Sequence, residues 1–401
     1  MTKADKEGQR KAPILRFKGF TDDWEQRKLG NLFNERKEKS TKGELLSVTL
    51  SNGVTKFSDL NKKDNSNIKS GNYKVVKKND IPYNSMRMWQ GASGVSSYDG
   101  IVSPAYTVLV PNRNSNSNFY AVLFKKKSIL NLFTRFSQGL TSDTWNLKYP
   151  ILKDIIVPFT NLEEQKRIFK IFNVINNLLA LYDRKLKLLS QVKKYFLDNL
   201  FAEKEYPNLR FKYFKKDKWE KTSLNSIVTY SNGKAHEKEI NNKGNLDLVM
   251  MNSITTGGRL ITKKKILSPQ DTLNKNDIVI VLSDIAKGEL IGKSSVIPCD
   301  NQYVLNQRIG CLHPTLNIDS FFVSKYINQK NRYFKSHAAG TSQINLSKSD
   351  VLNCTIYIPK VDEQHCVSNF IINVEKIINF YEYKKRHIIQ IKNILLNTMF
   401  I

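Results

Sequence analysis

Residues able to do chemistry are plentiful in this chain of 401 residues, but they form no catalytic motif. A DNA methyltransferase acting alone would need an Asn/Asp-Pro-Pro-Tyr/Phe loop, and the sequence contains no Pro-Pro dipeptide. No proline is followed by aspartate, which argues against a nuclease of the Pro-Asp…Glu-x-Lys type. Gly288 to Ser294 is one residue too short between its glycines for a phosphate-binding loop, so we interpret it as a turn. The sequence therefore predicts a chain that is not an enzyme.

The chain shows no sequence signal for a metal centre or for export. Its four cysteines all lie in the second half and show no Cys-x-x-Cys pairing, so we expect neither a disulfide framework nor a bound metal. The first 13 residues lack the apolar core of a secretory signal, and apolar runs such as Ile278–Leu282 are too short to cross a bilayer. These features favour a cytoplasmic protein.

Side chains that can read base edges lie in polar loops between short β-rich runs. Arg and Lys recognise guanine edges in the major groove, and Asn and Gln recognise adenine edges. The segment from Tyr83 to Gly91 carries Asn84, Arg87 and Gln90 among large apolar side chains. It also fits a structural interpretation, with Trp89 and the methionines in the core and Arg87 in a local ion pair.

Similar polar clusters occur in both halves of the chain, and each also fits a plain turn. In the first half the candidate DNA-binding residues are Ser51, Asn52, Lys56, Asn84, Ser85, Arg87, Gln90, Thr141 and Ser142. In the second half they are Asn252, Ser253, Arg259, Ser283, Asp284, Lys287, Asn306, Gln307, Arg308, Thr341, Ser342 and Gln343. Because the two sets differ, we expect them to read two different half-sites.

The charge of the chain supports a polyanionic partner. The formal net charge is +28, and neutralising phosphates releases condensed counterions. Little of it lies on two long amphipathic segments: residues 163–201 hold eight basic and four acidic side chains, and residues 362–401 hold five and four. A basic proteome that uses lysine as a solubilising surface residue is the alternative explanation.

The same module occurs twice along the sequence. Three groups of anchors return in the same order: Leu15-Arg16-Phe17-Lys18 as Leu209-Arg210-Phe211-Lys212, Trp24-Glu25 as Trp219-Glu220, and Lys78-Asn79-Asp80-Ile81 as Lys275-Asn276-Asp277-Ile278. We therefore predict a polar extension over 1–14, one domain over 15–160 with a helix over 161–203, and a second domain over 204–360 with a helix over 361–401. Runs at 105–110, 155–157, 278–282 and 355–358 predict strands of small mixed sheets.

Apolar residues alternate at spacings of three and four in both long segments, which is the pattern of a coiled-coil seam. The residues expected to pair the helices are Ile175, Leu178, Tyr182 and Leu189 in the first and Val374, Ile377, Tyr381 and Ile388 in the second. Thr160 and Glu163 fit a capping box at the start of the first helix. Each helix would be a rod of roughly 55 Å, too long for a small globular core.

The simplest way to bury both seams is an antiparallel pair, which relates the two modules by an approximate twofold axis. A register centred near Arg184 and Tyr383 would bring Asp183 towards Lys384 and Glu382 towards Lys185. The predicted fold class is thus two α/β (α+β) domains in tandem, each followed by a long helix, with the helices paired as an antiparallel coiled coil with pseudo-twofold symmetry.

The order of these motifs resembles that of the specificity subunits of type I restriction-modification enzymes. The resemblance rests on the Leu-Arg-Phe…Trp-Glu entries and on the Pro158…Glu163-Glu164-Gln165 and Pro359…Asp362-Glu363-Gln364 junctions. It implies two target-recognition domains that each bind half of a split DNA sequence, with the helices as a ruler of at most about sixteen base pairs.

The resemblance also implies partners that carry the chemistry. Two methyltransferase subunits would hold S-adenosylmethionine, and restriction/translocase subunits would use ATP and Mg, with no cofactor on this chain. Two alternatives stay open: a free-standing DNA modification or restriction enzyme, and a basic adaptor that binds RNA or an acidic protein.

Overall fold

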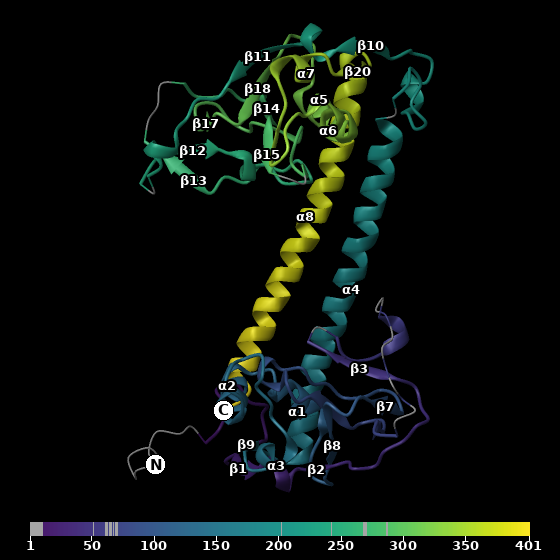
Figure 1. Ribbon diagram of the computed structural model, residues 1–401, viewed down its shortest axis with the longest axis vertical. Coiled ribbons are helices and arrows are strands. Elements are labelled where there is room, and N and C mark those ends of the chain that lie inside the picture. Colours follow the sequence, from purple (N-terminus) through teal and green to yellow (C-terminus); the bar gives the residue numbers. More distant parts are fainter. Residues whose placement is uncertain are drawn as a thin grey trace. The chain divides into compact units, whose positions relative to one another are not determined.

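The chain folds into two compact units. The computed structural model describes residues 11–50, 52–60, 63, 66, 68, 71–201, 203–241, 243–267, 271–285 and 288–401. The first unit comprises residues 1–183 and 383–401, and the second comprises residues 184–382. Each unit holds one mixed α/β domain and one segment of each of the two long helices, α4 (Leu162–Leu200) and α8 (Val361–Thr398) (Figure 1). The predicted tandem of α/β domains, each followed by a long helix, is confirmed.

The domain of the first unit is made of small antiparallel sheets with the orders β1-β9, β2-β8-β6, β3-β4 and β5-β7. Its strands and short helices are β1 (Glu25–Lys28), β2 (Phe33–Glu35), β3 (Leu46–Thr49), β4 (Gly53–Lys56), β5 (Lys74–Val76), β6 (Ile81–Asn84), β7 (Gly100–Val102), β8 (Tyr106–Pro111), α1 (Ser117–Leu123), α2 (Lys127–Phe136), α3 (Tyr149–Leu152) and β9 (Ile156–Phe159).

The domain of the second unit repeats this plan. Its sheets have the orders β10-β20, β11-β18-β14-β16, β13-β12-β17 and β15-β19. Among the strands formed by its described residues, only β12 and β17 pair parallel. The elements are β10 (Glu220–Ser223), β11 (Val228–Asn232), β12 (Leu246–Val249), β13 (Lys264–Ile266), β14 (Ile278–Val281), β15 (Ser283–Ile285), β16 (Ser294–Val296), β17 (Tyr303–Leu305), β18 (Ile309–Pro314), α5 (Ser320–Gln329), α6 (Asn331–His337), β19 (Gln343–Asn345), α7 (Lys348–Leu352) and β20 (Thr355–Ile358).

In each unit the hydrophobic core is completed by the end of a long helix that began in the other half of the sequence. In the first unit, Phe400 packs against Phe119 and Phe172, with ring centroids 5.2 and 5.7 Å apart. In the second, Phe201 packs against Phe322 at 5.1 Å. Since both cores need residues that are distant in sequence, neither domain is closed by its own contiguous stretch.

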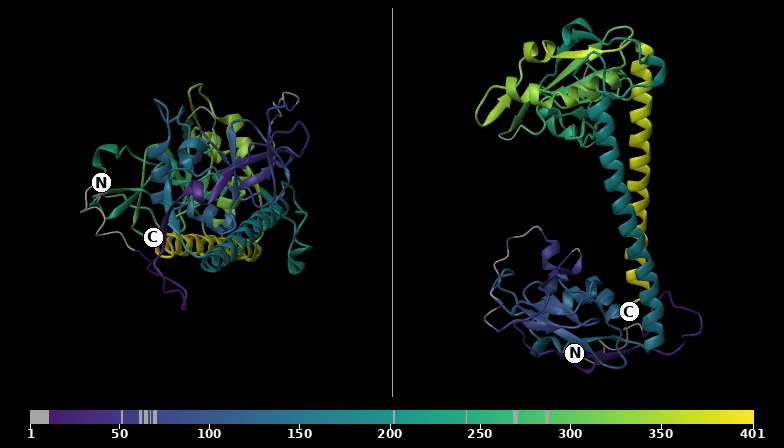
Figure 2. Two further views of the ribbon diagram at one scale, coloured as in Figure 1. Left: turned by 90° about the horizontal axis from the view of Figure 1, so that it is seen from below. Right: turned by 90° about the vertical axis from the view of Figure 1, so that its right-hand side faces the viewer.

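Within each unit the segments of α4 and α8 lie side by side and run antiparallel (Figure 2). In the first unit, Asn176 accepts a hydrogen bond from Lys392 (2.8 Å), and further along α4 Asp183 pairs with Lys385. The prediction for Asp183 named Lys384, the neighbouring lysine, so the antiparallel direction is confirmed and the ion pair that forms is one residue away.

The second unit shows the same direction. Lys193 pairs with Glu375 (2.6 Å), and the rings of Phe196 and Phe370 lie 4.6 Å apart. Lys185 donates to the Tyr381 hydroxyl (2.6 Å) and lies over its ring, where the register hypothesis had placed Glu382.

The side chains along the contact between the two helices are less buried than those of the domain cores. Of the eight residues predicted to pair the helices, Ile175 is buried and six are half-buried, namely Leu178, Tyr182, Leu189, Val374, Tyr381 and Ile388. Ile377 is 47% exposed, and the half-buried residue beside it is Ile378. A pair of helices buries only one stripe of each, which explains this partial burial.

The predicted capping box is wrong. Helix α4 begins at Leu162, and the side chain of Asn161 accepts the backbone N–H of Glu164 (2.9 Å), so Asn161 is the N-cap. The Thr160 hydroxyl instead donates to the Glu164 carboxylate.

Within the described residues, no helix has an apolar stretch long enough to cross a membrane.

Candidate nucleic-acid interface

A buried clamp fixes the first domain on its long helix. Arg16 Nε and Nη2 donate to the two carboxylate oxygens of Glu164 at 2.7 and 2.9 Å, and Trp24 Nε1 donates to Oε2 at 3.1 Å. The hydrogen bond to Glu164 raises the pKa of Arg16. The motif residues at the entry of the first module therefore have a structural role.

The clamp is repeated in the second domain with the same atoms. Arg210 Nε and Nη2 donate to Glu363 at 2.8 and 2.6 Å, and Trp219 Nε1 donates to Oε2 at 3.0 Å. The glutamine that follows each carboxylate adds a second contact: Gln165 accepts the backbone N–H of Asn116, and Gln364 that of Asp319. These residues hold both domains on their helices in the same way.

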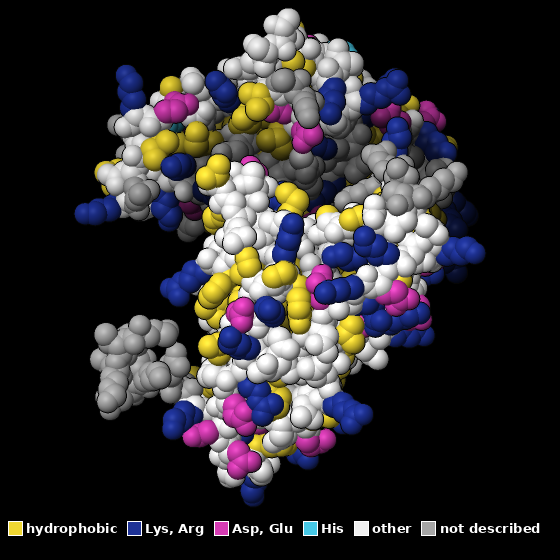
Figure 3. Space-filling view, turned by 60° about the horizontal axis from the view of Figure 1, so that its bottom comes forward, with side chains coloured by type: hydrophobic (Ala, Val, Ile, Leu, Met, Phe, Trp, Pro, Cys, Tyr) yellow, Lys and Arg dark blue, Asp and Glu magenta, His cyan; other side chains and the backbone are white. Residues whose placement is uncertain are grey.

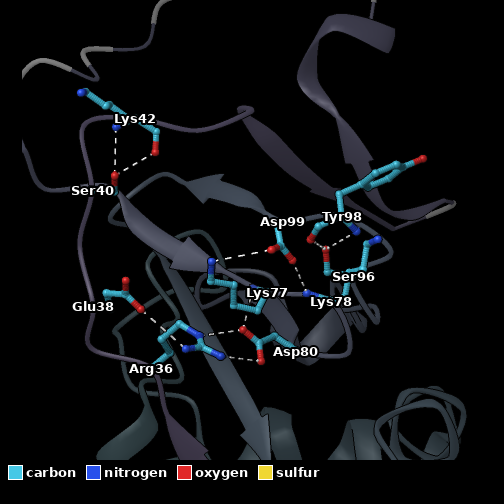
Figure 4. A network of polar contacts seen from close by, with 10 residues as sticks. All are labelled: Arg36, Glu38, Ser40, Lys42, Lys77, Lys78, Asp80, Ser96, Tyr98 and Asp99. Atoms are coloured by element: carbon cyan, nitrogen blue, oxygen red, sulfur yellow. Dashed lines mark hydrogen bonds and ion pairs between the residues drawn. The ribbon is translucent and has the colours of Figure 1, made fainter.

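The turn before β6 is repeated before β14, with a change in the partner of its aspartate. In the first domain Asp80 caps this turn through the Lys77 N–H (2.8 Å) and pairs with Arg36 (2.7 Å) (Figure 4). The network extends from Lys77 to Asp99 (3.6 Å).

In the second domain Asp277 caps the corresponding turn through the Asn274 N–H (2.8 Å), but its side-chain partner is the His313 imidazole at 2.7 Å. In the first domain the partner, Arg36, directly follows β2, whereas in the second domain the partner, His313, lies in β18. The hydrogen bond to Asp277 raises the pKa of His313.

Asp277, Cys311 and His313 also bring three potential metal-ligand atoms within 4.8 Å of one another. The match to the Asp80–Arg36 pair explains the carboxylate and the imidazole as hydrogen-bonded partners that stabilise this turn. Burial raises the pKa of the Cys311 thiol, which disfavours the thiolate that a metal requires. We therefore interpret this cluster as structural.

Two backbone hydrogen bonds and one aromatic contact bring the candidate loops of the first domain together. The Ser85 N–H donates to the Ala105 carbonyl (3.4 Å), and the Leu147 N–H donates to the Ser85 carbonyl (2.8 Å). The Trp89 and Trp145 rings meet edge to face at 5.2 Å. We call the loops at residues 84–92, 104–106 and 138–147 the first loop surface.

The second domain has the same framework. The Leu282 N–H donates to the Arg308 carbonyl (3.0 Å), and the Leu346 N–H donates to the Leu282 carbonyl (2.8 Å). We call the described loop residues at 282–285, 306–308 and 339–346 the second loop surface. Gly139 and Gly340 occupy matching places with φ of 146° and 129°, and a Cβ at Gly340 would lie 2.0 Å from the Gln343 carbonyl oxygen.

Some DNA-binding candidates of the first loop surface are exposed, and others are buried or already hydrogen-bonded within the domain. Arg87, Thr141 and Ser142 are exposed, and Gln90 is half-buried. Ser85 is buried against the Thr107 hydroxyl (3.0 Å), and the Asn84 side chain accepts the Met86 N–H. The structural alternative holds in part: Met88 is in the core, whereas Arg87 has no ion pair within the described residues.

A cavity of about 580 Å³ opens beside this surface, lined among others by Ser85, Met86, Tyr106 and Asn146. Asn52 is exposed on the hairpin that joins β3 and β4, where Gly53 approaches Gly94. Ser51 lies outside the described residues.

Lys56 lies beside Glu44 (3.7 Å) and over the Tyr98 ring. Its ammonium group is therefore already partly neutralised where it was expected to bind DNA.

The second loop surface separates in the same way. Gln307, Arg308, Thr341 and Ser342 are exposed, and Gln343 is half-buried. The Gln343 amide donates to the Ser283 hydroxyl (2.7 Å) and to Asn345 (3.2 Å), so its carbonyl oxygen is left to accept.

Four candidates of the second domain are buried, namely Ser253, Ser283, Asp284 and Asn306, and the Ser283 hydroxyl is already bonded to Gln343. Asp284 accepts the N–H groups of Ile285 and Leu290, both at 2.7 Å. Asn306 donates to Glu237 (3.0 Å), and Ser253 accepts the Met250 N–H (3.0 Å). Side chains with these bonds are not available to read bases, so their assignment as DNA-binding residues is not supported.

The remaining candidates lie elsewhere. Asn252 is exposed, and Lys287 lies outside the described residues. Arg259 faces Asn379 of α8 (3.4 Å) and lines a cavity of about 470 Å³ together with Lys193, Lys325 and Glu375. Both lysines pair with Glu375, which ties the second domain to the helix segments of its own unit.

Charge alone does not locate the interface. Lys and Arg side chains are spread over the face shown in Figure 3 with acidic side chains among them. The framework bonds, rather than a basic patch, are what bring the exposed candidates together.

Sequence reasoning missed two features. Trp145 joins the two loops of the first surface through Trp89, and pairing these two tryptophans would have suggested it. A second apolar row on the long helices is exposed: Leu188 and Tyr195 on α4 in the second unit, with Phe380 on α8. The first unit has Val174 and Leu181 on α4, with Ile394 on α8. Counting a second heptad row would have revealed it.

Each unit combines two antiparallel helix segments with one α/β domain, so the chain belongs to the class of proteins built from two repeated α/β modules with long helices. Residues 21–191 and 216–393 match the family described as the type I restriction modification DNA specificity domain, and the chain belongs to that family.

Relatives agree with this assignment. The Type I restriction enzyme MjaVIII specificity subunit of Methanocaldococcus jannaschii is 23% identical over 345 residues, which cover 81% of this chain and 79% of the relative. The putative MjaX specificity subunit of the same organism is 20% identical over 73% of this chain and 69% of that relative.

Solved structures share the fold. The S subunit of the type I restriction-modification system from M. genitalium matches with a TM-score of 0.63 at 16% identity, over 97% of this chain and 99% of that one. A chain from a structure on complex assembly and conformational transition of the type I R-M system matches with a TM-score of 0.57 at 14% identity, over 94% and 97%.

Proposed function

We propose that this chain reads a two-part DNA target, one half with each domain, as the non-catalytic specificity subunit of a type I restriction-modification complex. The observation that carries the proposal is the contrast between framework and surface. The clamps and the loop-joining hydrogen bonds repeat atom for atom, and an exposed Thr-Ser pair is common to both loop surfaces, whereas the exposed arginine comes from a different loop on each, Arg87 after β6 and Arg308 before β18. One framework with two sets of exposed polar groups suits two different half-sites.

Affinity would come from the phosphate backbone. A net charge of +28 spread over the surface favours neutralising phosphates, a term that depends on salt and not on sequence. The exposed polar groups of the loop surfaces would then add sequence preference through base edges.

The modification chemistry would belong to partners. Two methyltransferase subunits would hold S-adenosylmethionine, and restriction/translocase subunits would use ATP and Mg. The sequence supports this division, since it lacks the motifs of a methyltransferase or a common nuclease.

The exposed apolar rows on the long helices support docking of those partners. In the second unit Leu188 and Tyr195 are 52% and 58% exposed at heptad spacing on α4. In the first unit Val174 and Leu181 are 59% and 63% exposed at the same spacing. Apolar rows of this kind are usually covered by another helix, and one row in each unit fits two methyltransferase subunits.

The long helices would act as the ruler between half-sites. The 39 residues of α4 span about 58 Å, which bounds the separation at about seventeen base pairs.

Mapping methylated adenines genome-wide, in cells with and without this chain, tests the proposal. We expect one motif of two fixed halves and a fixed spacer that disappears with the chain. Methylation that is unchanged without it would contradict the proposal. If the purified chain alone cleaved or methylated DNA, the enzyme alternative would hold, and equal binding to all duplexes would favour the adaptor.

A further inference from the structure

Arg87 and Arg308 differ from the other arginines that the candidate domains use. Arg16, Arg36 and Arg210 hold buried carboxylates. Arg87 and Arg308 are exposed, and within the described parts of the chain neither guanidinium has a hydrogen-bond partner or a carboxylate within ion-pair distance. The pKa of Glu237 is lowered by its hydrogen bond from Asn306 and also by the charge of Arg308, so this carboxylate lies near Arg308 without binding it. Both groups therefore keep all their donors available.

The backbone of each arginine is nevertheless fixed. The Arg87 N–H donates to the Asn84 carbonyl (3.0 Å), and the Arg87 carbonyl accepts from Gln90 (3.0 Å) and Ala92 (3.1 Å). The Arg308 carbonyl accepts from Leu282 (3.0 Å). A fixed backbone under a free side chain lowers the entropy cost of placing that side chain on a ligand.

The two arginines reach the same framework from different loops. In the first domain the Ser85 N–H donates to the Ala105 carbonyl, and Arg87 follows Ser85 by two residues. In the second domain the matching hydrogen bond runs from the Leu282 N–H to the Arg308 carbonyl, so Arg308 corresponds to Ala105 and not to Arg87. The place that matches Arg87 is taken by Asp284, whose carboxylate is occupied by backbone N–H groups. Each loop surface thus presents an unpaired guanidinium beside the same pair of joined loops.

We propose that Arg87 and Arg308 each read a guanine, one in each half-site, by donating two hydrogen bonds to O6 and N7. The inference rests on the proposed function, and it adds which residues set the base preference. Arginine is suited to this because its planar fork matches the two acceptors of guanine in the major groove. The guanine can lie on either strand.

The test uses the complex of the full chain with its methyltransferase subunits, after the wild-type target has been mapped. Each guanine of the target is replaced in turn by 7-deazaguanine, which lacks the N7 acceptor. At one guanine we expect wild-type binding to weaken roughly 10-fold or more, and binding by Arg308→Ala to be insensitive to that replacement. Arg87→Ala should show the same insensitivity at one guanine of the other half-site.

Substituting the base at those positions gives a second readout. Loss of either arginine should reduce discrimination against the wrong base roughly 5- to 150-fold at one position only. Arg308→Lys keeps the charge but not the fork, so it should retain salt-dependent affinity and lose the guanine preference. Arg113→Ala and Arg332→Ala remove other exposed arginines of the two domains and should leave the motif unchanged.

Two results would overturn the inference. One is a uniform loss of affinity at all sequences for Arg87→Ala and Arg308→Ala, which would mean phosphate contacts. The other is an unchanged motif for both variants. A wild-type complex that shows no two-part motif at all would instead refute the proposed function itself.

Discussion

Lengthening the two long helices by one heptad each should lengthen the DNA spacer without changing the half-sites. The insertions go between Asp183 and Arg184 in α4 and between Glu382 and Tyr383 in α8, where the two units meet along the chain. Every contact within each unit is then kept. Seven helical residues add about 10.5 Å, which is about three base pairs of duplex.

The duplex twist modifies this expectation. Three base pairs also rotate a half-site by about 100° around the duplex, whereas a heptad returns the helix to nearly the same face. The protein with one added heptad per helix should therefore prefer a target with a longer spacer and bind it with lower affinity than the wild type binds its own target. Three heptads add about 31 Å, or about nine base pairs, and should recover tighter binding because the half-site is nearly back in phase.

The assay is methylation by the reconstituted complex of a DNA library whose spacer varies in length and whose half-sites are randomised. A heptad in α4 alone is the control, since it shifts the helix register and should abolish fixed spacing. An unchanged spacer in the doubly extended protein, or altered half-sites, would refute the ruler.

Three further predictions follow from the contacts. Glu363→Gln leaves the buried Arg210 guanidinium without its counter-charge, so it should lower the free energy of unfolding of the second unit in urea by about 3–5 kcal/mol. The control Glu163→Gln removes an exposed carboxylate and should lower it by less than about 0.5 kcal/mol. Equal losses for the two variants would contradict the role of the clamp. The hydrogen bond to Asp277 raises the pKa of His313 in the folded protein. The free energy that this pair contributes to folding is therefore complete below the unfolded pKa of about 6.5 and is lost as the pH rises through the folded pKa. His313→Gln should flatten this pH dependence in thermal melts recorded at a series of pH values, and an unchanged profile would argue against the pair. Tyr195→Asp places a charge in the exposed apolar row and should weaken methyltransferase-subunit binding roughly tenfold or more by calorimetry, with DNA half-site preference unchanged; unaltered affinity would place the docking surface elsewhere.

The sequence predicted the architecture because that information is periodic and repeated. Heptad spacing specifies a buried stripe whatever the neighbouring domain does, and a duplicated motif fixes which segments are equivalent. The strands predicted at 105–110 and 278–282 follow from runs of β-branched residues and appear as β8 and β14. The antiparallel direction followed from the need to bury both seams.

The site could be predicted only as a set of loops. Asp284 and Asn306 have the same polar chemistry as exposed readers, yet they bond to backbone amides and to Glu237. Which of the two roles a polar loop residue takes depends on strand pairings between distant segments, such as Leu282 with Arg308. The capping error has a similar origin, because Asn161 and Thr160 are both good caps and the clamp engages Thr160.

The central claim is that each domain reads its own half of the target. It is tested most directly by replacing residues 210–359 with a second copy of residues 16–158. The substitutions Val367→Ile, Ile371→Phe and Leu200→Met give the transplanted core the side chains that it meets in the first unit. Methylome mapping of cells with this chain should show the first half-site on both sides of the spacer. A target that still contains the second half-site would contradict the account.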